Sequence, residues 1–464
     1  QGSLLPHEHV SATVIQAALG EVAARYLSGE LHGPVAALLK RLPPAGLLRR
    51  DDETPTEAAI RMTASMAGGC LVIQGPPGTG KTFTASRVIT ALLATGKKVG
   101  VASHSHKAVV NLMLACGEAA RAGGGRLQGI KVGGEAEGPL FSSNPDLQYV
   151  PDSSAAQTRY SGGVIGGTAW LFSRPEWEGA LDFLFIDEAG QVALANAIAM
   201  ARCAKNLVLL GDQMQLEQPV QGSHPGDAGL SALQYALKDI AASRPDAPVF
   251  HAVVPPDAGL FLGESRRMHP LVCRFISESI YGGRLGSHPD CSRQRIAVPS
   301  GAQGLITSKS GIVFSCVEHD GNIQQSDEEV ERVWAVWQEL NGRLYTGKDG
   351  NTKPLTLADF LFIAPYNAQV RALQSVLPNG ARVGSVDRFQ GQEAPVCILS
   401  LCSSYGEYGS RGLAFILDRN RVNVAISRAQ CLAVVVADPR IAGSIPGSLD
   451  EMRLLNLFCK LVQA

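Results

Sequence analysis

The sequence lacks the features that mark several classes of protein. No apolar stretch is long enough to cross a bilayer, and no secretory signal is visible at its start. Its 10 cysteines contain no C-x-x-C pair and no Cys/His cluster, which argues against structural zinc and iron–sulfur sites. Scattered cysteines of this kind fit reduced thiols, so we expect a cytoplasmic protein, and the lack of a long apolar stretch predicts no membrane contact.

The chain also lacks a strong charge of either sign. Its formal net charge is −1, with 41 Lys and Arg against 42 Asp and Glu. This balance is no signature of nucleic-acid binding, but a motor could confine its positive charge to one channel. The length of 464 residues, 45% of them hydrophobic and 18% charged, indicates a globular protein of several domains.

What the sequence does contain is a complete phosphate-binding loop. It reads Gly75-Pro76-Pro77-Gly78-Thr79-Gly80-Lys81-Thr82 and follows the apolar run 71–73. The glycines let backbone N–H groups turn toward phosphates, Lys81 reaches the β and γ oxygens, and Thr82 offers a hydroxyl to Mg²⁺. An incidental Gly/Pro-rich loop is the alternative, and the strand before it and the helix after it argue against that. The loop predicts binding of a nucleoside triphosphate but does not say what the energy is for.

Two successive α/β domains are the simplest interpretation of the remaining pattern. Short runs rich in Val, Ile, Leu and Phe alternate with helical stretches, and runs apolar on both faces indicate parallel strands covered by helices. We expect a first domain over 55–253, with a less regular excursion over 117–162, and a second domain over 254–464. Residues 1–54 are interpreted as a cloning remnant, Gln1-Gly2-Ser3, followed by a helical piece. The expected strands span 71–73, 98–102, 163–165, 183–186 and 207–210, then 260–262, 311–316, 360–364, 382–386, 396–401 and 432–436.

Acidic residues follow one of the expected strands. Asp187 and Glu188 come directly after the run 183–186, where the carboxyl end of a parallel strand places functional groups. Asp187 is predicted to hold Mg²⁺ and Glu188 to act as general base on the attacking water. A solvated acidic strand end is the alternative for the pair taken alone. Gln215, after the run 207–210, is a candidate sensor of the γ-phosphate.

Arginines that could clamp phosphate oxygens gather in the second domain. Arg421 and Arg428 fall on one face of an expected helix, and Arg267 is a third candidate. Surface salt bridges are the usual role of helical arginines. The prediction rests instead on how functional residues divide between the domains, because the first domain has a phosphate loop and acids but no obvious arginine finger. A nucleotide between the domains would need that division. Glu393 could accept from a ribose hydroxyl, and Ser385 could contact the phosphates of a strand.

Together these segments resemble the ordered motif set of a superfamily 1 helicase. The motifs extend over about residues 55–440 and read GPPGTGKT (75–82), SHSHKAV (103–109), GTAW (167–170), DEAGQ (187–191), GDQMQL (211–216), RRMHP (266–270), APYNAQV (364–370), VDRFQGQE (386–393) and NRVNVAISRA (420–429). The likeness is greatest to the nonsense-mediated-decay, Okazaki-fragment-processing and senataxin-type group. Within that group, the residues of the motifs are similar to those of bacterial members. It implies two RecA-like domains, hydrolysis of ATP with Mg²⁺ at their interface, and 5′→3′ movement on single strands.

The resemblance also implies roles for individual residues. The ATP site would include Lys81, Thr82, Asp187, Glu188, Gln215, Arg267, Glu393 and Arg428. Positions that track nucleic acid match Ser105, His106, Thr168, Tyr366 and Ser385. Glu57 stands where the family usually has an adenine-reading Gln, and Arg266 stands in place of a Tyr, so that its guanidinium would stack on the base. His106 stands where relatives commonly have Asn, and we expect a neutral hydrogen-bonding side chain rather than a pH switch.

Several functions remain open at this point. The leading one is an ATP-driven helicase or translocase on single-stranded DNA, with RNA as the alternative substrate. A translocase that strips protein without separating strands is the nearest rival. A nucleotide-gated binding module is disfavoured because the catalytic residues are all present, and an AAA-type remodeller predicts one core and a hexamer, whereas two cores on one chain favour a monomer.

The N-terminal segment and the segment 117–162 lead to further predictions. Bacterial members often have a RecB-like nuclease before the helicase, and only residues 1–54 precede the motor here. We therefore expect that a nuclease was removed or that this member lacks one. Residues 4–50 and 117–162 could be a stalk and a strand-gripping insertion, or they could be packing elements.

Overall fold

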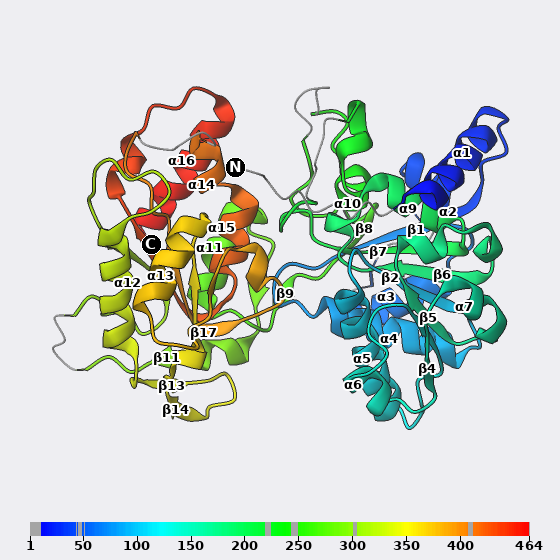
Figure 1. The fold of residues 1–464 in the computed structure, drawn as a ribbon, viewed down its shortest axis with the longest axis horizontal. Helices are drawn as coiled ribbons and strands as arrows, with labels where there is room; N and C mark the ends of the chain where they lie inside the picture. The colour runs from blue at the N-terminus through cyan, green and yellow to red at the C-terminus, as the bar shows by residue number, and fades with distance from the viewer. Residues whose placement is uncertain are drawn as a thin grey trace, which may run out of the picture. The chain divides into compact units, whose positions relative to one another are not determined.

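The computed structural model describes residues 11–42, 44, 49–50, 52–218, 224–242, 249–299, 304–406 and 412–463. The chain divides into two compact units, each built on its own sheet (Figure 1). The first comprises the described residues of Gln1–Gly75, Lys81–Gln213 and Glu217–Leu262. The second comprises those of Pro76–Gly80, Met214–Leu216 and Gly263–Ala464.

The first unit contains an 8-stranded sheet in which every neighbouring pair of strands is parallel. The strand order is β4-β3-β5-β2-β6-β7-β1-β8. Its strands are β1 (Cys70–Gln74), β2 (Val99–Ala102), β3 (Gly129–Val132), β4 (Leu147–Val150), β5 (Val164–Gly167), β6 (Leu181–Ile186), β7 (Ala204–Gly211) and β8 (Gly259–Phe261). Its helices are α1 (Thr13–Leu27), α2 (Gly33–Leu39), α3 (Pro55–Ala64), α4 (Lys81–Ala94), α5 (His106–Ala122), α6 (Pro139–Ser142), α7 (Ser153–Arg159), α8 (Ala169–Phe172), α9 (Leu194–Ala201) and α10 (Ala232–Ala236).

Successive residues of the central strands face two separate cores, because side chains alternate along a strand. In β7, Leu207 and Leu209 belong to a core shared with α1, α2, α9 and α10. Val208 and Leu210 belong to a core shared with α3, α4 and α5. Burial on both faces explains why the strands are nearly continuous apolar runs in the sequence.

Two expectations about the domain plan are corrected. The segment 117–162 is no excursion outside the core, because it completes α5 and adds two parallel strands to the sheet, β3 beside β5 and β4 beside β3. The run 260–262 belongs to the first unit rather than the second, because β8 pairs with β1. The boundary therefore falls after Leu262 instead of after residue 253.

The N-terminal helices are packing elements of the first unit. Ile15, Ala18 and Val22 of α1 and Val35 of α2 are buried in the core that they share with α9 and β7. Of the two interpretations left open for this segment, a stalk or a packing element, the described residues favour packing.

The second unit contains a 5-stranded parallel sheet in the order β12-β18-β17-β15-β16. Its strands are β12 (Gly311–Cys316), β15 (Phe360–Ile363), β16 (Val383–Gly384), β17 (Ala394–Ser400) and β18 (Ala429–Ala437). Its helices are α11 (Pro270–Ile280), α12 (Asp327–Leu340), α13 (Asn367–Val376), α14 (Gly412–Ile416), α15 (Arg419–Ile426) and α16 (Leu449–Val462). Small sheets pair β9 (Glu264–Ser265) with β10 (Gly286–Ser287), and β13 (Leu344–Thr346) with β11 (Arg295–Ile296) and β14 (Thr352–Pro354).

The predicted fold class is confirmed: both units are α/β, with parallel sheets covered by helices. Among the described helices, none combines the length and the apolar character that crossing a membrane requires.

Candidate active site

The phosphate loop connects β1 to the first turn of α4, as the sequence predicts. The N–H of Gly75 donates to the carbonyl of Gly211 at 2.9 Å, which ties the start of the loop to the end of β7. Gly78 and Gly80 have φ angles of 76° and 79°, in the left-handed region that costs glycine nothing. Lys81 Nζ donates to the carbonyl of Gly75 at 2.9 Å, so its ammonium lies over the loop. This backbone is the one that a polyphosphate site requires.

The middle of the loop, Pro76–Gly80, belongs to the second unit and is held there by β9 and the residues after it. Ser265 Oγ donates to the carbonyl of Pro77 at 3.0 Å, and the N–H of Arg266 donates to the carbonyl of Gly78 at 2.8 Å. A Cβ at Gly78 would lie 2.5 Å from the Cβ of Arg267. Only glycine fits at this position, for reasons of both space and backbone angle.

Asp187 lies directly after β6 and is buried, with 8% of its surface exposed. Its Oδ1 accepts a hydrogen bond of 2.9 Å from the N–H of Glu188. Burial raises the pKa of Asp187 to about 7; the negative charge of Glu188 adds to the rise, and the positive charge of Lys81 opposes it. A buried carboxylate that needs a positive partner suits a divalent cation.

The residues present fit Mg²⁺ bound as it is in phosphate-transfer sites, by few protein ligands together with water and substrate phosphate. Among the described residues, no group of three or more His, Cys, Asp or Glu side chains could hold a metal by itself. Mg²⁺ usually takes one or two protein oxygens, with the remainder from water and substrate phosphate. Asp187 and the hydroxyl of Thr82, at the start of α4, are the protein oxygens that could serve.

Glu188 has a backbone conformation that is rare for its residue type. Its φ and ψ are 51° and 43°, and among the described non-glycine residues only Arg41 and Cys402 also have positive φ. Such a conformation costs on the order of 1–3 kcal/mol and is found chiefly where function needs it. This strained turn comes directly after the buried Asp187.

Arg428 is buried just beyond α15, with 2% of its surface exposed, and contacts the predicted phosphate sensor. Its Nη2 donates to Gln215 Oε1 at 3.5 Å, within the second unit. Its Nη1 donates to the carbonyl of Gln392 and its Nε to that of Val424, both at 3.1 Å. These bonds fix the plane of the guanidinium. Arg421 differs, because its guanidinium carbon lies 4.4 Å from the centre of the Phe415 ring.

Arg267 and Glu393 form an ion pair in the second unit. Arg267 Nη1 also donates to the carbonyl of Ser427 at 3.2 Å, and Gln430 Nε2 donates to Glu393 Oε1 at 2.8 Å. Burial opposes ionisation of Glu393, but the charge of Arg267 and the hydrogen bonds from Gln430 and Arg267 together outweigh it and lower the pKa of that carboxyl. The carboxylate predicted to accept from ribose is therefore ionised and oriented by an arginine.

The residues predicted to read the base have other partners in this structure. Glu57 closes a capping box at the start of α3, where its Oε2 accepts from the N–H and the hydroxyl of Thr54, both at 2.8 Å. These hydrogen bonds lower the pKa of Glu57. The side chain of Arg266 is 67% exposed and pairs with Glu264 at 3.4 Å. Their roles toward adenine stay predictions.

The first-unit candidates for nucleic-acid contact all follow carboxyl ends of strands. Ser105 follows β2 and caps α5, its Oγ accepting from the N–H of Ala108 at 3.3 Å. His106 is the first residue of α5. Thr168 follows β5 and occupies the N-cap position of α8. In open parallel sheets this edge is where ligands bind.

Of the two second-unit candidates, one is buried and one is half-buried. Tyr366, after β15, is 6% exposed, and its ring centroid lies 5.0 Å from that of Phe415. Phe415 therefore packs against the ring on which a base would stack. Ser385 is half-buried after β16, and its carbonyl accepts from the N–H of Arg388 at 3.1 Å.

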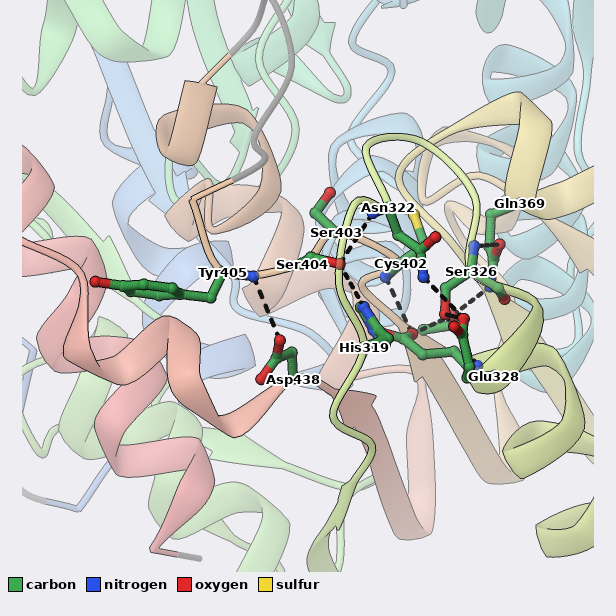
Figure 2. A network of polar contacts seen from close by, with 12 residues as sticks. His319, Asn322, Ser326, Glu328, Gln369, Cys402, Ser403, Ser404, Tyr405 and Asp438 are labelled. Carbon is green, nitrogen blue, oxygen red and sulfur yellow. Dashed lines mark hydrogen bonds and ion pairs between the residues drawn. The ribbon is translucent and has the colours of Figure 1, made fainter.

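Two buried polar clusters were not predicted. In the first unit, Lys131 Nζ donates to His106 Nδ1 at 2.9 Å; a lysine inside the apolar run Ile130-Lys131-Val132 was the signal in the sequence. In the second unit, Glu329 of α12 accepts from His319 Nε2 at 3.0 Å and from the N–H of Cys402 at 3.0 Å. Figure 2 shows this second network, in which His319 Nδ1 lies 2.7 Å from the hydroxyl of Ser404. Its members are too far apart in sequence for a local pattern to reveal them.

Comparisons with known proteins agree with the two-unit plan. Two family models described as AAA domain match residues 56–236 and 250–440. "DNA replication ATP-dependent helicase/nuclease DNA2" of Gallus gallus is 23% identical to this chain, over 98% of the chain and 43% of the relative. The protein of the same description from Schizosaccharomyces pombe is 26% identical, over 84% of the chain and 27% of the relative. "DNA-binding protein SMUBP-2" of Rattus norvegicus is 27% identical, over 56% of the chain and 25% of the relative.

The chain spans less than half the length of these curated relatives. They are eukaryotic proteins, so the expected likeness to bacterial members stays a prediction.

Proposed function

We propose that this chain, which belongs to the superfamily 1 helicases of the DNA2, SMUBP-2 and senataxin-like group, couples ATP hydrolysis to movement along single-stranded nucleic acid. The observation that carries the proposal is the group at the carboxyl ends of β1 and β6. There the phosphate loop with Lys81 lies near enough to the buried Asp187 for its charge to act on that carboxyl, and Glu188 follows in a strained turn.

Each group has a distinct chemical task in this proposal. Loop N–H groups and Lys81 neutralise the β- and γ-phosphates, and Asp187 with Thr82 would hold Mg²⁺, which stabilises charge on those oxygens. Glu188 orients the attacking water and takes its proton. Gln215 would sense the γ-phosphate, and Arg267 and Arg428 would stabilise the charge that develops during transfer.

The nucleic acid would contact Ser105, His106 and Thr168 in the first unit. These side chains are small or neutral donors at the edge of the sheet, which suits backbone recognition without reading sequence. Single-stranded DNA is the proposed substrate because the relatives that match over most of the chain are described as DNA replication helicase/nucleases. Movement 5′→3′ and a monomeric state are parts of the same proposal.

The decisive experiment measures ATPase stimulation by single-stranded DNA and RNA side by side, then strand separation on 5′-tailed and 3′-tailed duplexes. We expect stimulation by DNA and unwinding of the 5′-tailed duplex only. Stimulation without unwinding would favour a translocase that strips protein. No ATP turnover with either nucleic acid would overturn the proposal in favour of a binding module.

A further inference from the structure

Lys131 lies on β3, the inner of the two strands that residues 117–162 add to the sheet. Each of the three N–H groups of its ammonium has a polar partner. The residue is buried, with 1% of its surface exposed. Its Nζ donates to the carbonyls of Val132 and Gly133 and lies against His106 Nδ1, each at 2.9 Å. An ammonium has three hydrogens and no lone pair, so each of these three contacts requires an acceptor.

This requirement determines the protonation of His106. Nδ1 must offer a lone pair to Lys131, and a neutral imidazole then carries its hydrogen on Nε2. A second proton on Nδ1 would meet the ammonium directly. Burial lowers the pKa of His106, and the positive charge of Lys131 lowers it further.

The turn after β3 holds the imidazole ring in place. Gly133 and Gly134 have φ angles of 66° and 74°. A Cβ on Gly134 would lie 3.0 Å from His106 Cγ and 3.2 Å from Nδ1, and one on Gly133 would lie 3.3 Å from Cε1. The backbone can close on the ring only because neither residue has a side chain. From β4, the hydroxyl of Tyr149 donates to the carbonyl of Gly134 at 3.3 Å and supports the same turn.

We infer that Lys131 is a positioning residue, which fixes His106 as a neutral imidazole whose Nε2–H is presented as a hydrogen-bond donor to a phosphate oxygen of the bound strand. The inference rests on the proposed function, in which His106 contacts single-stranded nucleic acid. An uncharged donor aids recognition of the backbone without displacing a counterion, so this contact adds affinity that salt does not weaken. It also explains how a histidine can act at a position where relatives commonly carry Asn, whose amide is likewise a neutral donor.

The first test uses the wild-type chain. Proteins labelled with ¹⁵N-histidine report the tautomer through the nitrogen shifts and long-range couplings of each ring, and the His106→Asn variant assigns the signal. We expect the Nε2–H form at pH 7, and we expect it to persist to a lower pH than the neutral form of an ordinary histidine does. An Nδ1–H form, or protonation at an ordinary pKa, overturns the inference.

The second test measures binding to single-stranded DNA by fluorescence anisotropy. His106→Asn should bind within about twofold of wild type, and His106→Ala should bind roughly 3–10-fold more weakly, the usual effect of one neutral hydrogen bond. Neither variant should change the dependence of affinity on salt. Lys131→Met should weaken binding by no more than His106→Ala does, because the freed imidazole can still donate from Nε2 part of the time, and it should have no further effect when His106 is already Ala.

A matched control distinguishes the effect of Lys131 on His106 from the general effect of losing one positive charge. Lys107→Met removes an exposed lysine from the first turn of the same helix. If Lys107 meets a phosphate, this variant lowers affinity and the salt slope together, by about one unit of slope, but it leaves the His106 signal unchanged.

The outcomes distinguish the inference from the proposed function on which it rests. If Lys131→Met does not fold, the wild-type spectrum and the two His106 variants still decide the matter. Normal binding by His106→Ala, with the Nε2–H form present, removes the strand-contacting role of His106 and with it the positioning role of Lys131. Weak binding by His106→Ala with the other tautomer overturns the inference and leaves the proposed function standing.

Discussion

The backbone N–H of Glu188 donates to the side-chain carboxylate of Asp187 at 2.9 Å, so the two acids of the candidate site are joined through the main chain. The bond depends on the left-handed turn at Glu188, with φ of 51°. One oxygen of Asp187 is thereby oriented by the backbone of its neighbour. The two side chains also act on each other, because the negative charge of Glu188 adds to the rise in the pKa of Asp187.

Glu188→Gln should abolish turnover while preserving nucleotide binding. The amide keeps the size of the side chain but cannot take a proton, so kcat with saturating single-stranded DNA should fall roughly 10²–10⁴-fold. Affinity for a fluorescent ATP analogue should change little. Glu118→Gln, at an exposed site on α5, is the matched control. Full activity in Glu188→Gln would remove Glu188 from the role of base.

Glu188→Gly should make the first unit more stable while destroying activity. Glycine adopts positive φ without a Cβ penalty, so relief of the strained turn should add about 1 kcal/mol. For a unit of this size that raises the thermal midpoint by roughly 2–4 °C in calorimetry. Glu188→Gln, which keeps the Cβ, should not gain this stability. An unchanged or lower midpoint in the glycine variant would mean that the turn is not strained.

Gly78→Ala should abolish ATP binding, whereas Gly96→Ala should not. Both glycines have a φ of +76°, so both substitutions strain the backbone equally. A Cβ at Gly78 would meet Arg267 at 2.5 Å, but a Cβ at Gly96 would meet nothing within 4 Å. Equilibrium binding of labelled ATP to the two variants separates crowding from strain. Equal loss of binding in both variants would show that backbone strain, and not the contact with Arg267, causes the loss.

Glu57→Gln should increase the preference for ATP over GTP. A carboxylate can accept from the adenine amino group but cannot donate to N7, whereas an amide can do both. The substitution preserves the capping box with Thr54, because glutamine serves as well as glutamate at that position. The ratio of kcat/KM for ATP and GTP should be near unity in wild type and should rise several-fold in Glu57→Gln. Glu53→Gln, on the segment just before α3, is the control, and equal ratios in all three proteins would show that residue 57 does not read the base.

The stability of the second unit should fall as pH rises above neutrality. His319 and Glu329 form a pair with both side chains fully buried. Burial alone lowers the pKa of His319, but the hydrogen bond and charge of Glu329 outweigh it and hold that pKa above its usual value. A raised folded-state pKa contributes stability that is fully present below about pH 6.5, the unfolded value, and is lost as pH rises through the folded value.

Calorimetry between pH 6 and 9 measures this effect. One thermal transition should move to lower temperature as pH rises, and the movement should be lost in His319→Gln, which keeps a donor but does not titrate. His224→Gln, at an exposed site of the first unit, should leave the movement intact. An unaltered pH dependence in His319→Gln would assign it to other groups.

Much of this protein could be predicted from local sequence. The phosphate loop, the acids after a buried strand and most of the strands depend on turn chemistry and burial patterns confined to a few neighbouring residues. Glycines at 78 and 80 and a lysine at 81 place a loop and a helix start wherever the rest of the chain goes. Each helicase motif is likewise a short run of neighbouring residues, so the motifs and their order along the chain are enough to indicate the group of helicases.

Only the tertiary structure decided which strands lie side by side and which buried polar groups meet. The pairing of β3 with β5 turned an apparent excursion into sheet, because a short parallel strand acquires its hydrogen bonds from a distant partner. The same pairing brought Lys131 to His106, and the order β17 next to β18 and β15 brought Ser400 to Glu329. A buried lysine or glutamate is costly without partners, but the sequence does not reveal which residues satisfy it. The topology of the sheet supplies those partners. In the first unit, Lys131 is the partner from which we infer the protonation of His106, a candidate contact to nucleic acid.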